Sequence, residues 1–205
     1  MQLPVEIEFA LSGDWASQAE ALMDEHHMVA VSDDESVRIE FGTHLVMQME
    51  RMADTEVCVL YGRFIRSLEE FAYMLSRAMA GRRVIEPNRE SLIEALGRQY
   101  GRTKRRYVVW HDAHLLADRK PRLFDEVADC LMGVAAEREY ASEDTLILTR
   151  CLFLGSPTLL WSRGLMEWAH EGEAEPLWQT VSGLAKPPVK TVRVVRGYDA
   201  RPWSR

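Results

Sequence analysis

Two carboxylates one helical turn apart are the residues of this sequence best suited to bind a charged partner. Glu90 and Glu94 follow Asn88 in the segment Asn88-Arg89-Glu90-Ser91-Leu92-Ile93-Glu94-Ala95-Leu96. On a helix, positions i and i+4 project from the same side, about 40° apart, and Leu92 and Leu96 then point roughly the other way. Like charges at this spacing repel each other, and a cationic partner would relieve the repulsion. The pattern predicts an exposed acidic pair that binds a basic protein, and an ordinary polar helix face is the alternative.

Three polar residues that follow an apolar run, His111, Asp112 and His114, are of the types that bind metal ions. If the run continues as a strand, residues 111 and 114 point to opposite faces and do not share an ion. We therefore expect no metal here, and we expect Asp112 to cap the turn. The roles of the two histidines stay open, and the sequence indicates no cofactor elsewhere.

Signatures of nucleophilic catalysis are missing from the sequence. There is no Gly-x-Ser-x-Gly elbow. The three cysteines, Cys58, Cys130 and Cys151, lie within apolar runs and lack CxxC spacing, which predicts buried free thiols in a reducing compartment. We therefore expect a protein that is not an enzyme.

The segment Gly62–Ser67 lies between an apolar run and a predicted helix, where a phosphate-binding loop would be expected. It lacks the glycines that let the backbone approach a phosphate and the lysine that pairs with it. Two other features resemble nucleotide-binding ATPases: Asp112 ends a run as a magnesium-binding aspartate does, and Thr149 takes the place of a polar sensing residue. ATP hydrolysis is not expected, but a degenerate relative that kept the sheet and lost the nucleotide stays open.

Apolar runs that alternate with amphipathic segments must position these residues. The predicted strands cover 56–62, 107–110 and 145–149. The predicted helices follow a capping box at Ser67–Glu70, open at Asn88, and carry Pro121 in a first turn. This alternation predicts an α/β fold in which a small parallel β-sheet is flanked by helices, a three-layer core with N- and C-terminal extensions.

The extensions divide the chain into three regions. Residues 1–55 form an acidic N-terminal α/β extension, 56–150 the α/β core, and 151–205 a helical extension with a basic edge strand. In the first region we expect a strand over Val5–Ala10, helices over 14–25 and 44–52, and a hairpin of 28–31 and 37–41 around the polar loop 32–36. In the last, a helix over 156–169 precedes Val189–Val195, whose alternation predicts a strand paired with Val5–Ala10.

Charge is distributed unevenly along the 205 residues, whose formal net charge is −7. Residues 1–60 hold 13 acidic and 2 basic side chains, a charge of −11, whereas residues 186–205 carry +5. An acidic surface makes nucleic acid an improbable partner and favours a basic protein. The basic run from Arg98 to Arg106 is interpreted as a solvated loop, or as a patch that pairs internally or with a second copy in a homo-oligomer.

Neither a secretory leader nor a membrane-spanning run is visible. The N-terminal segment Met1-Gln2-Leu3-Pro4-Val5-Glu6 has no basic region and no apolar stretch, and no run of about 18 apolar residues occurs. The expected location is the cytoplasm, without contact to a membrane.

Short motifs within residues 56–150 resemble barstar, the family of intracellular protein inhibitors of barnase-type ribonucleases. The resemblance starts with Val59-Leu60-Tyr61-Gly62 and the helix entry from Ile65 to Phe71, and it continues in Asn88-x-Glu90-x-Leu92-x-Glu94-x-Leu96. A strand ending in Trp110, a helix to about residue 139 and the strand 145–149 follow in the order of that family.

In barstar-like proteins the second helix and the loop before it plug the nuclease active site, and their acids mimic substrate phosphates. The resemblance implies that Asn88, Glu90 and Glu94 contact a ribonuclease-like partner. This sequence departs from the family at Val84 and Ile85, where aromatic and glycine residues are typical, and in its two extensions.

Two functions therefore stay open. The first is a non-enzymatic protein-binding module, an inhibitor that occupies a basic active site through an acidic helix. The alternative is a degenerate relative of P-loop or AAA-type ATPases, without the phosphate-binding loop, that acts in assembly or regulation. The number of parallel strands separates them, because we expect about three for the first fold and about five for the second.

Overall fold

The computed structural model describes residues 2–12, 15–79, 84–97, 101–138, 147–173 and 189–196. Its helices are α1 (Trp15–Glu25), α2 (Glu35–Met49), α3 (Leu68–Ala78), α4 (Arg89–Gly97), α5 (Ala113–Arg119), α6 (Pro121–Arg138) and α7 (Arg163–Glu173). Short 3-10 turns form η1 (Gly62–Phe64) and η2 (Pro157–Trp161). Its strands are β1 (Ile7–Ala10), β2 (His27–Val31), β3 (Thr55–Tyr61), β4 (Arg105–His111), β5 (Leu148–Gly155) and β6 (Val189–Val195).

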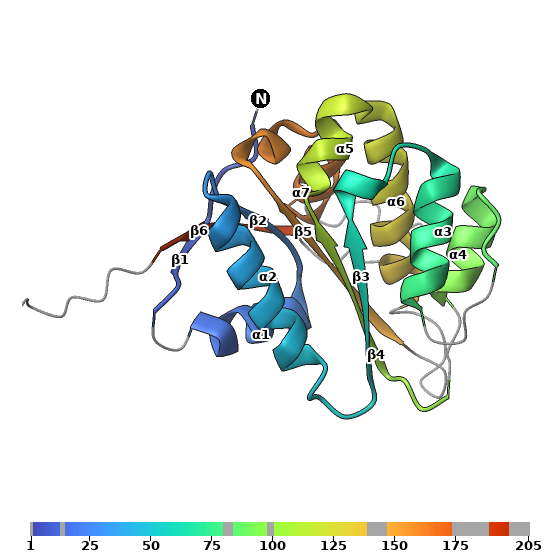
Figure 1. Ribbon diagram of the computed structural model, residues 1–205, viewed down its shortest axis with the longest axis horizontal. Coiled ribbons are helices and arrows are strands. Elements are labelled where there is room, and N and C mark those ends of the chain that lie inside the picture. The colour runs from blue at the N-terminus through green and yellow to red at the C-terminus, as the bar shows by residue number, and fades with distance from the viewer. Residues whose placement is uncertain are drawn as a thin grey trace, which may run out of the picture.

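The strands form one sheet in the order β1-β6-β2-β5-β4-β3, and every neighbouring pair is parallel (Figure 1). This confirms the predicted α/β class with a parallel sheet flanked by helices. The predicted core supplies the three adjacent strands β3, β4 and β5. Strands from both extensions complete the same sheet, which has six strands in the described ranges.

The N-terminal and C-terminal strands pair as the sequence predicts. β1 lies beside β6 in parallel register, with Ile7 opposite Val192 and Phe9 opposite Val194. The Lys190 ammonium lies 2.6 Å from the Glu6 carboxylate, so opposite charges reinforce the pairing. β6 also pairs with β2, so β1 forms the sheet edge opposite β3, and the prediction that Val189–Val195 is an edge strand is wrong.

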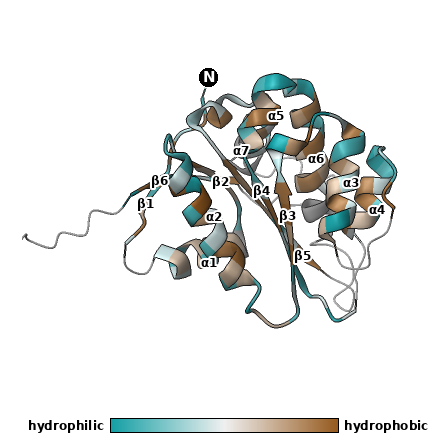
Figure 2. Cartoon of the chain, viewed as in Figure 1, coloured by the Kyte–Doolittle hydropathy of each residue, from teal (hydrophilic) through white to brown (hydrophobic). Residues whose placement is uncertain are grey.

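Helices cover both faces of the sheet, and each face has its own apolar core. One core joins α1 and α2 to inward side chains such as Met28 and Leu152. The other joins α3 to α7 to side chains that include Trp110 and Phe153. Because both faces are covered, the central strands are almost wholly hydrophobic (Figure 2). None of the helices in these ranges has the length and apolar character needed to span a bilayer.

Several local predictions are wrong, among them the single helix over 156–169, which is divided at Ser162 into η2 and α7. Residues 37–41 form part of α2 and not a hairpin strand, because Val37, Phe41 and Leu45 recur at a spacing of four and are buried on one side of the helix. The third core strand begins at Leu148 and runs to Gly155, beyond its predicted end. Arg150 lies just past the predicted strand, but it is 4% exposed and lies inside β5.

The predicted capping box at the start of α3 is confirmed. The Ser67 hydroxyl accepts a hydrogen bond from the Glu70 backbone N–H at 3.3 Å. The Glu70 carboxylate reaches back to the Arg66 backbone N–H at 2.5 Å. The first contact satisfies a backbone donor of the first helical turn, and the second ties the residue before the N-cap to the helix.

Candidate functional site

The carboxyl ends of β2 and β5 form the switch point of the sheet. The helix that follows β2, α2, packs on one face, whereas η2 and α7, which follow β5, pack on the other. In open parallel sheets a ligand binds in the crevice where neighbouring connections diverge in this way. The loops after β2, β4 and β5 therefore define the candidate site.

The connection from β2 to α2 is the acidic segment Ser32–Asp34. Asp34 is the N-cap of α2, and its carboxylate accepts hydrogen bonds from the backbone N–H groups of Ser36 at 2.8 Å and Val37 at 3.4 Å. The Ser36 hydroxyl donates a further bond at 2.6 Å. The hydrogen bond from this hydroxyl is the main cause that holds the pKa of Asp34 below its ordinary value. The carboxylate is therefore ionised at neutral pH.

The capped N-terminus of α2 lacks the free N–H groups with which a P-loop binds phosphate. A P-loop offers free N–H groups at a helix N-terminus, together with a lysine, to the phosphate oxygens. Here a carboxylate of the chain takes those N–H groups, and Asp33 and Glu35 add negative charge on either side. The three-residue connection is also too short for the GxxxxGK[ST] loop. Both the charge and the length oppose a bound nucleotide.

Charged side chains from both ends of the chain line a cavity of about 390 Å³ beside this loop. Asp33, Asp34, Arg193 and Arg196 are among its lining residues. The Arg196 guanidinium lies 3.7 Å from the Asp34 carboxylate and donates a hydrogen bond to the Ser36 hydroxyl at 2.6 Å. Arg196 thus compensates the negative charge of Asp34 in the crevice.

Asp112 follows β4 at the N-cap position of α5 with a left-handed backbone, at φ 54°, but its side chain makes no capping hydrogen bond there. Its carboxylate is 8% exposed and lies 2.6 Å from the Arg63 guanidinium, which also lies 3.3 Å from Glu35. The hydrogen bond to Asp112 raises the pKa of Arg63 above its ordinary value. The aspartate that resembles a magnesium ligand is therefore neutralised by an arginine.

The two histidines beside Asp112 lie in different surroundings. His111 stacks on Tyr61 with ring centroids 5.2 Å apart. His114 is on α5, and its Nδ1 is buried without a hydrogen-bond partner. Burial is the main cause that lowers the pKa of both residues, so both are neutral at pH 7. Nowhere in the described ranges do three or more His, Cys, Asp or Glu side chains gather closely enough to hold a metal.

The predicted position of a phosphate-binding loop is wrong. Gly62–Ser67 follows β3, which is one of the two edge strands of the described sheet and not one of the switch-point strands. Thr149 lies at the start of β5, at the end of the strand opposite the candidate site. The sequence signal for the switch-point loop was Asp34 followed by the spacing of Val37 and Phe41, which together mark a helix N-terminus.

The acidic helix lies on the face of the sheet that α6 also covers. Leu92 and Leu96 are buried, and Glu90 and Glu94 are exposed, as the spacing predicts. Asn88 accepts a hydrogen bond from the Ser91 backbone N–H at 2.8 Å and thereby caps α4. The three predicted partner-binding residues therefore belong to one helix, remote in sequence from the switch-point loops.

The three thiols are buried and free, as predicted. Burial raises the pKa of Cys58 to about 12 and that of Cys130 to about 11, and it also raises the pKa of Cys151. Since the thiolate is the reactive form, none of the three is poised for nucleophilic chemistry at neutral pH.

No family model matches the sequence, and a search of curated proteins gives no match. Similar solved structures include a chain of Drosophila ORC bound to DNA, at 9% identity and a TM-score of 0.49, covering 75% of this chain and 40% of that one. Chains of Drosophila ORC with Cdc6, bound to poly(dA/dT) DNA or to GC-rich DNA, give 11% and 12% identity and TM-scores of 0.49 and 0.48. These two matches cover 28% of each of those chains, and they cover 88% and 87% of this chain. This chain thus spans well under half of those chains, and a likeness of this degree carries no functional argument.

Proposed function

We propose that this protein is a non-catalytic relative of P-loop-type ATPases that has lost nucleotide binding and acts through protein contacts in assembly or regulation. The capping of α2 by Asp34 is the observation that carries the proposal, because it fills the phosphate position with a carboxylate. The six parallel strands also support it, since they exceed the sheet of about three expected for a barstar-like inhibitor.

The neutralised aspartate agrees with the same function. In a nucleotide-hydrolysing site, a strand-end aspartate must be free to hold magnesium. Asp112 instead bonds Arg63, which ties the loop after β3 to the loop after β4. Asp112, at the position where such a site would hold magnesium, thus serves with Arg63 as a structural link between two loops.

Nucleotide should leave the stability of the protein unchanged. A site with micromolar affinity would add about 4 kcal/mol at a thousandfold excess of ligand, because binding stabilises by RT ln(1 + [L]/Kd). We expect equal melting temperatures with and without ATP and magnesium. Sodium triphosphate serves as a control for anion effects, and a stabilisation by ATP that triphosphate does not reproduce would contradict the proposal.

A barstar-like inhibitor is the second candidate, and the exposed acids of α4 favour it. Leu92 and Leu96 fix this helix in the core, and an ion pair of 3.2 Å between Arg89 and Asp129 ties it to α6. Glu90 and Glu94 are thereby presented from a rigid element. Such a surface fits a basic protein site.

Changing Glu90 and Glu94 to Gln should weaken binding to a basic partner about tenfold or more, because favourable charge interactions across the interface are lost. The partner is first identified by affinity capture from the native cell extract and mass spectrometry. Titration calorimetry then compares the wild type with E90Q/E94Q and with E40Q/E50Q, a pair of exposed acids on and next to α2. Equal affinity of wild type and E90Q/E94Q would exclude the acidic helix as the binding surface.

A further inference from the structure

Exposed apolar side chains surround a cavity at the carboxyl end of β3. Ile39 on α2 is 47% exposed, Tyr61 at the end of β3 is 40% exposed and Phe64 on η1 is 59% exposed. They line a cavity of about 270 Å³ together with four polar residues, Thr43, Arg63, His111 and Asp112. We call this cavity the aromatic pocket.

His111 gives the aromatic pocket a polar group that is available to a ligand. Its side chain is more than nine-tenths buried, and no group of the described residues hydrogen-bonds either ring nitrogen. The ring is fixed in place, because it stacks on Tyr61 and because a Cβ at Gly42 on α2 would collide with it. A buried polar group without a partner is costly, so a ligand that hydrogen-bonds the imidazole is favoured.

Charge and size restrict what the aromatic pocket binds. Its arginine, Arg63, already contacts the carboxylates of Asp112 and Glu35, so an anionic ligand finds no uncompensated cation there. The volume lies below the range of about 300–1,000 Å³ typical of pockets for whole ligands, which disfavours a nucleotide or a cofactor. One uncharged aromatic ring with a hydroxyl group fits both the apolar walls and the free imidazole. The tyrosine side chain has this chemistry.

The apolar surface continues along α2 beyond the pocket. Ile39, Thr43 and Met47 recur at every fourth position and therefore project from one side of the helix. Met47 is as exposed as Ile39, although an amphipathic helix usually directs its apolar residues inward. Contiguous exposed apolar surface of this kind marks interaction sites.

β3 has an open backbone edge beside the same pocket. Among the described strands it pairs with β4 alone, and Figure 1 shows it between α2 and α3. Natural edge strands usually carry exposed charges, prolines or bulges that prevent pairing with another chain. β3 has none of these, because its register with β4 is continuous and its single charged residue, Glu56, is buried and paired with Arg106. The edge is therefore suited to accept a further strand.

We propose that an extended segment of a partner protein pairs with the open edge of β3 and places a tyrosine side chain in the aromatic pocket, with its hydroxyl at His111. The tyrosine ring then packs among Ile39, Tyr61 and Phe64. This inference rests on the proposed protein-binding function. It names the surface that makes the contact and the chemistry of the segment bound there.

Fluorescence anisotropy with the full chain tests the pocket. The probe is the fluorescein-labelled peptide Thr-Val-Thr-Tyr-Thr-Val-Thr, and Phe or Ser replaces its tyrosine in two matched peptides. Phe64→Ala removes one wall of the pocket, and Tyr73→Ala removes an aromatic side chain of equal exposure on α3. We expect Phe64→Ala to weaken binding of the tyrosine peptide at least about tenfold, as truncation of a buried aromatic contact usually does, and Tyr73→Ala to bind like the wild type. The phenylalanine peptide should bind about three- to tenfold less tightly, because it lacks the hydroxyl, and the serine peptide should bind least.

Methylated peptides test the strand pairing. Alternate backbone N–H groups of a strand point to opposite edges. Two further versions of the tyrosine peptide therefore carry N-methyl groups on alternate residues, each version along one edge. The version methylated along the edge that faces β3 should lose binding, and the other should keep it. Equal affinities of the two versions would contradict strand addition.

Several other outcomes would overturn the proposal. They are absence of saturable binding by the tyrosine peptide, equal binding by Phe64→Ala and Tyr73→Ala, and equal binding of the tyrosine and phenylalanine peptides. Binding of N-acetyltyrosinamide as tight as that of the peptide would assign the pocket to a small molecule. A dimer in sedimentation velocity that Phe64→Ala dissociates would assign the surface to a second copy of this chain. None of these results involves the N-terminus of α2, so the ATP melting experiment tests the proposed function separately.

Discussion

Arg106→Met should lower the free energy of unfolding by about 3–5 kcal/mol, the typical cost of leaving one member of a buried ion pair without its partner. Arg106 is 0% exposed, and its Nε lies 2.7 Å from the carboxylate of Glu56, which is 8% exposed. The two residues face each other across β3 and β4. The same guanidinium donates a hydrogen bond to the Leu96 carbonyl at the end of α4. Urea unfolding followed by tryptophan fluorescence measures the loss.

The double variant Glu56→Gln/Arg106→Met separates charge from packing. If the uncompensated carboxylate is the main cause, the double variant should be more stable than Arg106→Met alone. Arg105→Met, one position earlier on β4 and only half-buried, is the matched control and should cost much less. A loss below about 1 kcal/mol for Arg106→Met would show that this ion pair is not a main support of the β3–β4 pairing.

This ion pair also marks a limit of prediction from the sequence. The basic run that ends at Arg106 reads as a solvated loop, because consecutive charges are usually exposed. Its last two residues instead begin β4, and Arg106 finds its partner in Glu56, fifty residues earlier. Only the parallel register of β3 and β4 brings them together. The internal pairing of part of the basic run was one of the predicted alternatives, and for Arg106 it is confirmed.

The apolar runs predicted most of the fold correctly. The runs at 56–62 and 107–110 are apolar and bounded by polar turns, and they fall in β3 and β4, except that Gly62 begins η1. The pairing of the two terminal strands followed from alternation and opposite charge. The order of the strands in the sheet could not be predicted from the sequence, because a crossover connection has no local sequence signal. Without that order, the switch point could not be located, and the search for a phosphate loop was directed to the wrong strand.

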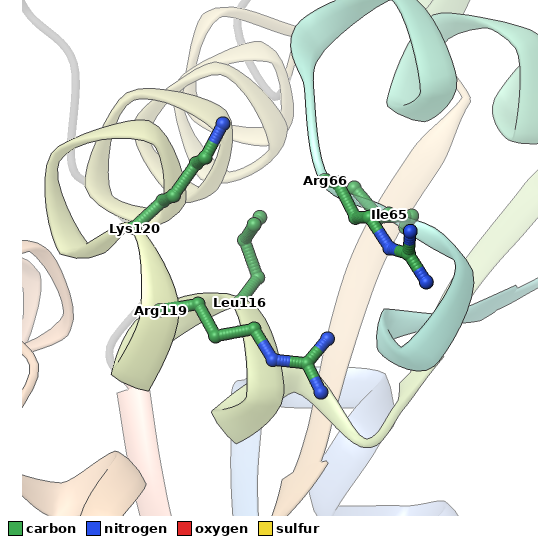
Figure 3. A pocket seen from close by; sticks show the side chains of 5 residues that line it. All are labelled: Ile65, Arg66, Leu116, Arg119 and Lys120. Carbon is green, nitrogen blue, oxygen red and sulfur yellow. The ribbon is translucent and has the colours of Figure 1, made fainter.

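The candidate site shows the same division between local and long-range information. That Glu90 and Glu94 are exposed over buried Leu92 and Leu96 could be predicted from helical spacing alone. The bond between Arg63 and Asp112 joins loops after two different strands and required the fold. The hollow between the start of α3 and the junction of α5 with α6 likewise brings Arg66 near Arg119 and Lys120, which are distant in sequence (Figure 3). Local pattern thus predicts faces of elements, and the sites between elements depend on topology.

Acidification should destabilise the protein, and His27 should account for much of the loss. His27 is fully buried at the start of β2, where its Nδ1 accepts a hydrogen bond from the Cys151 backbone N–H at 3.0 Å. Burial, with smaller effects of Arg150 and His26, lowers its pKa from 6.5 to about 3. Between pH 6.5 and about 3, His27 is therefore protonated in the unfolded chain but neutral in the folded protein. The stability present above that pH falls as the pH drops towards 3, by about 3 kcal/mol at pH 4.

His27→Asn tests this cause, because the Asn amide oxygen can still accept the Cys151 N–H but does not titrate. We expect the variant to be less stable than the wild type at neutral pH, since a smaller side chain leaves a cavity. Its free energy of unfolding should nevertheless fall less steeply than that of the wild type on acidification. His44→Asn, at an exposed histidine on α2, is the matched control. His111 and His114, whose pKa values burial also lowers, will keep some slope in every variant. If urea unfolding gives wild type and His27→Asn the same slope with pH, protonation of His27 is not what destabilises the sheet in acid.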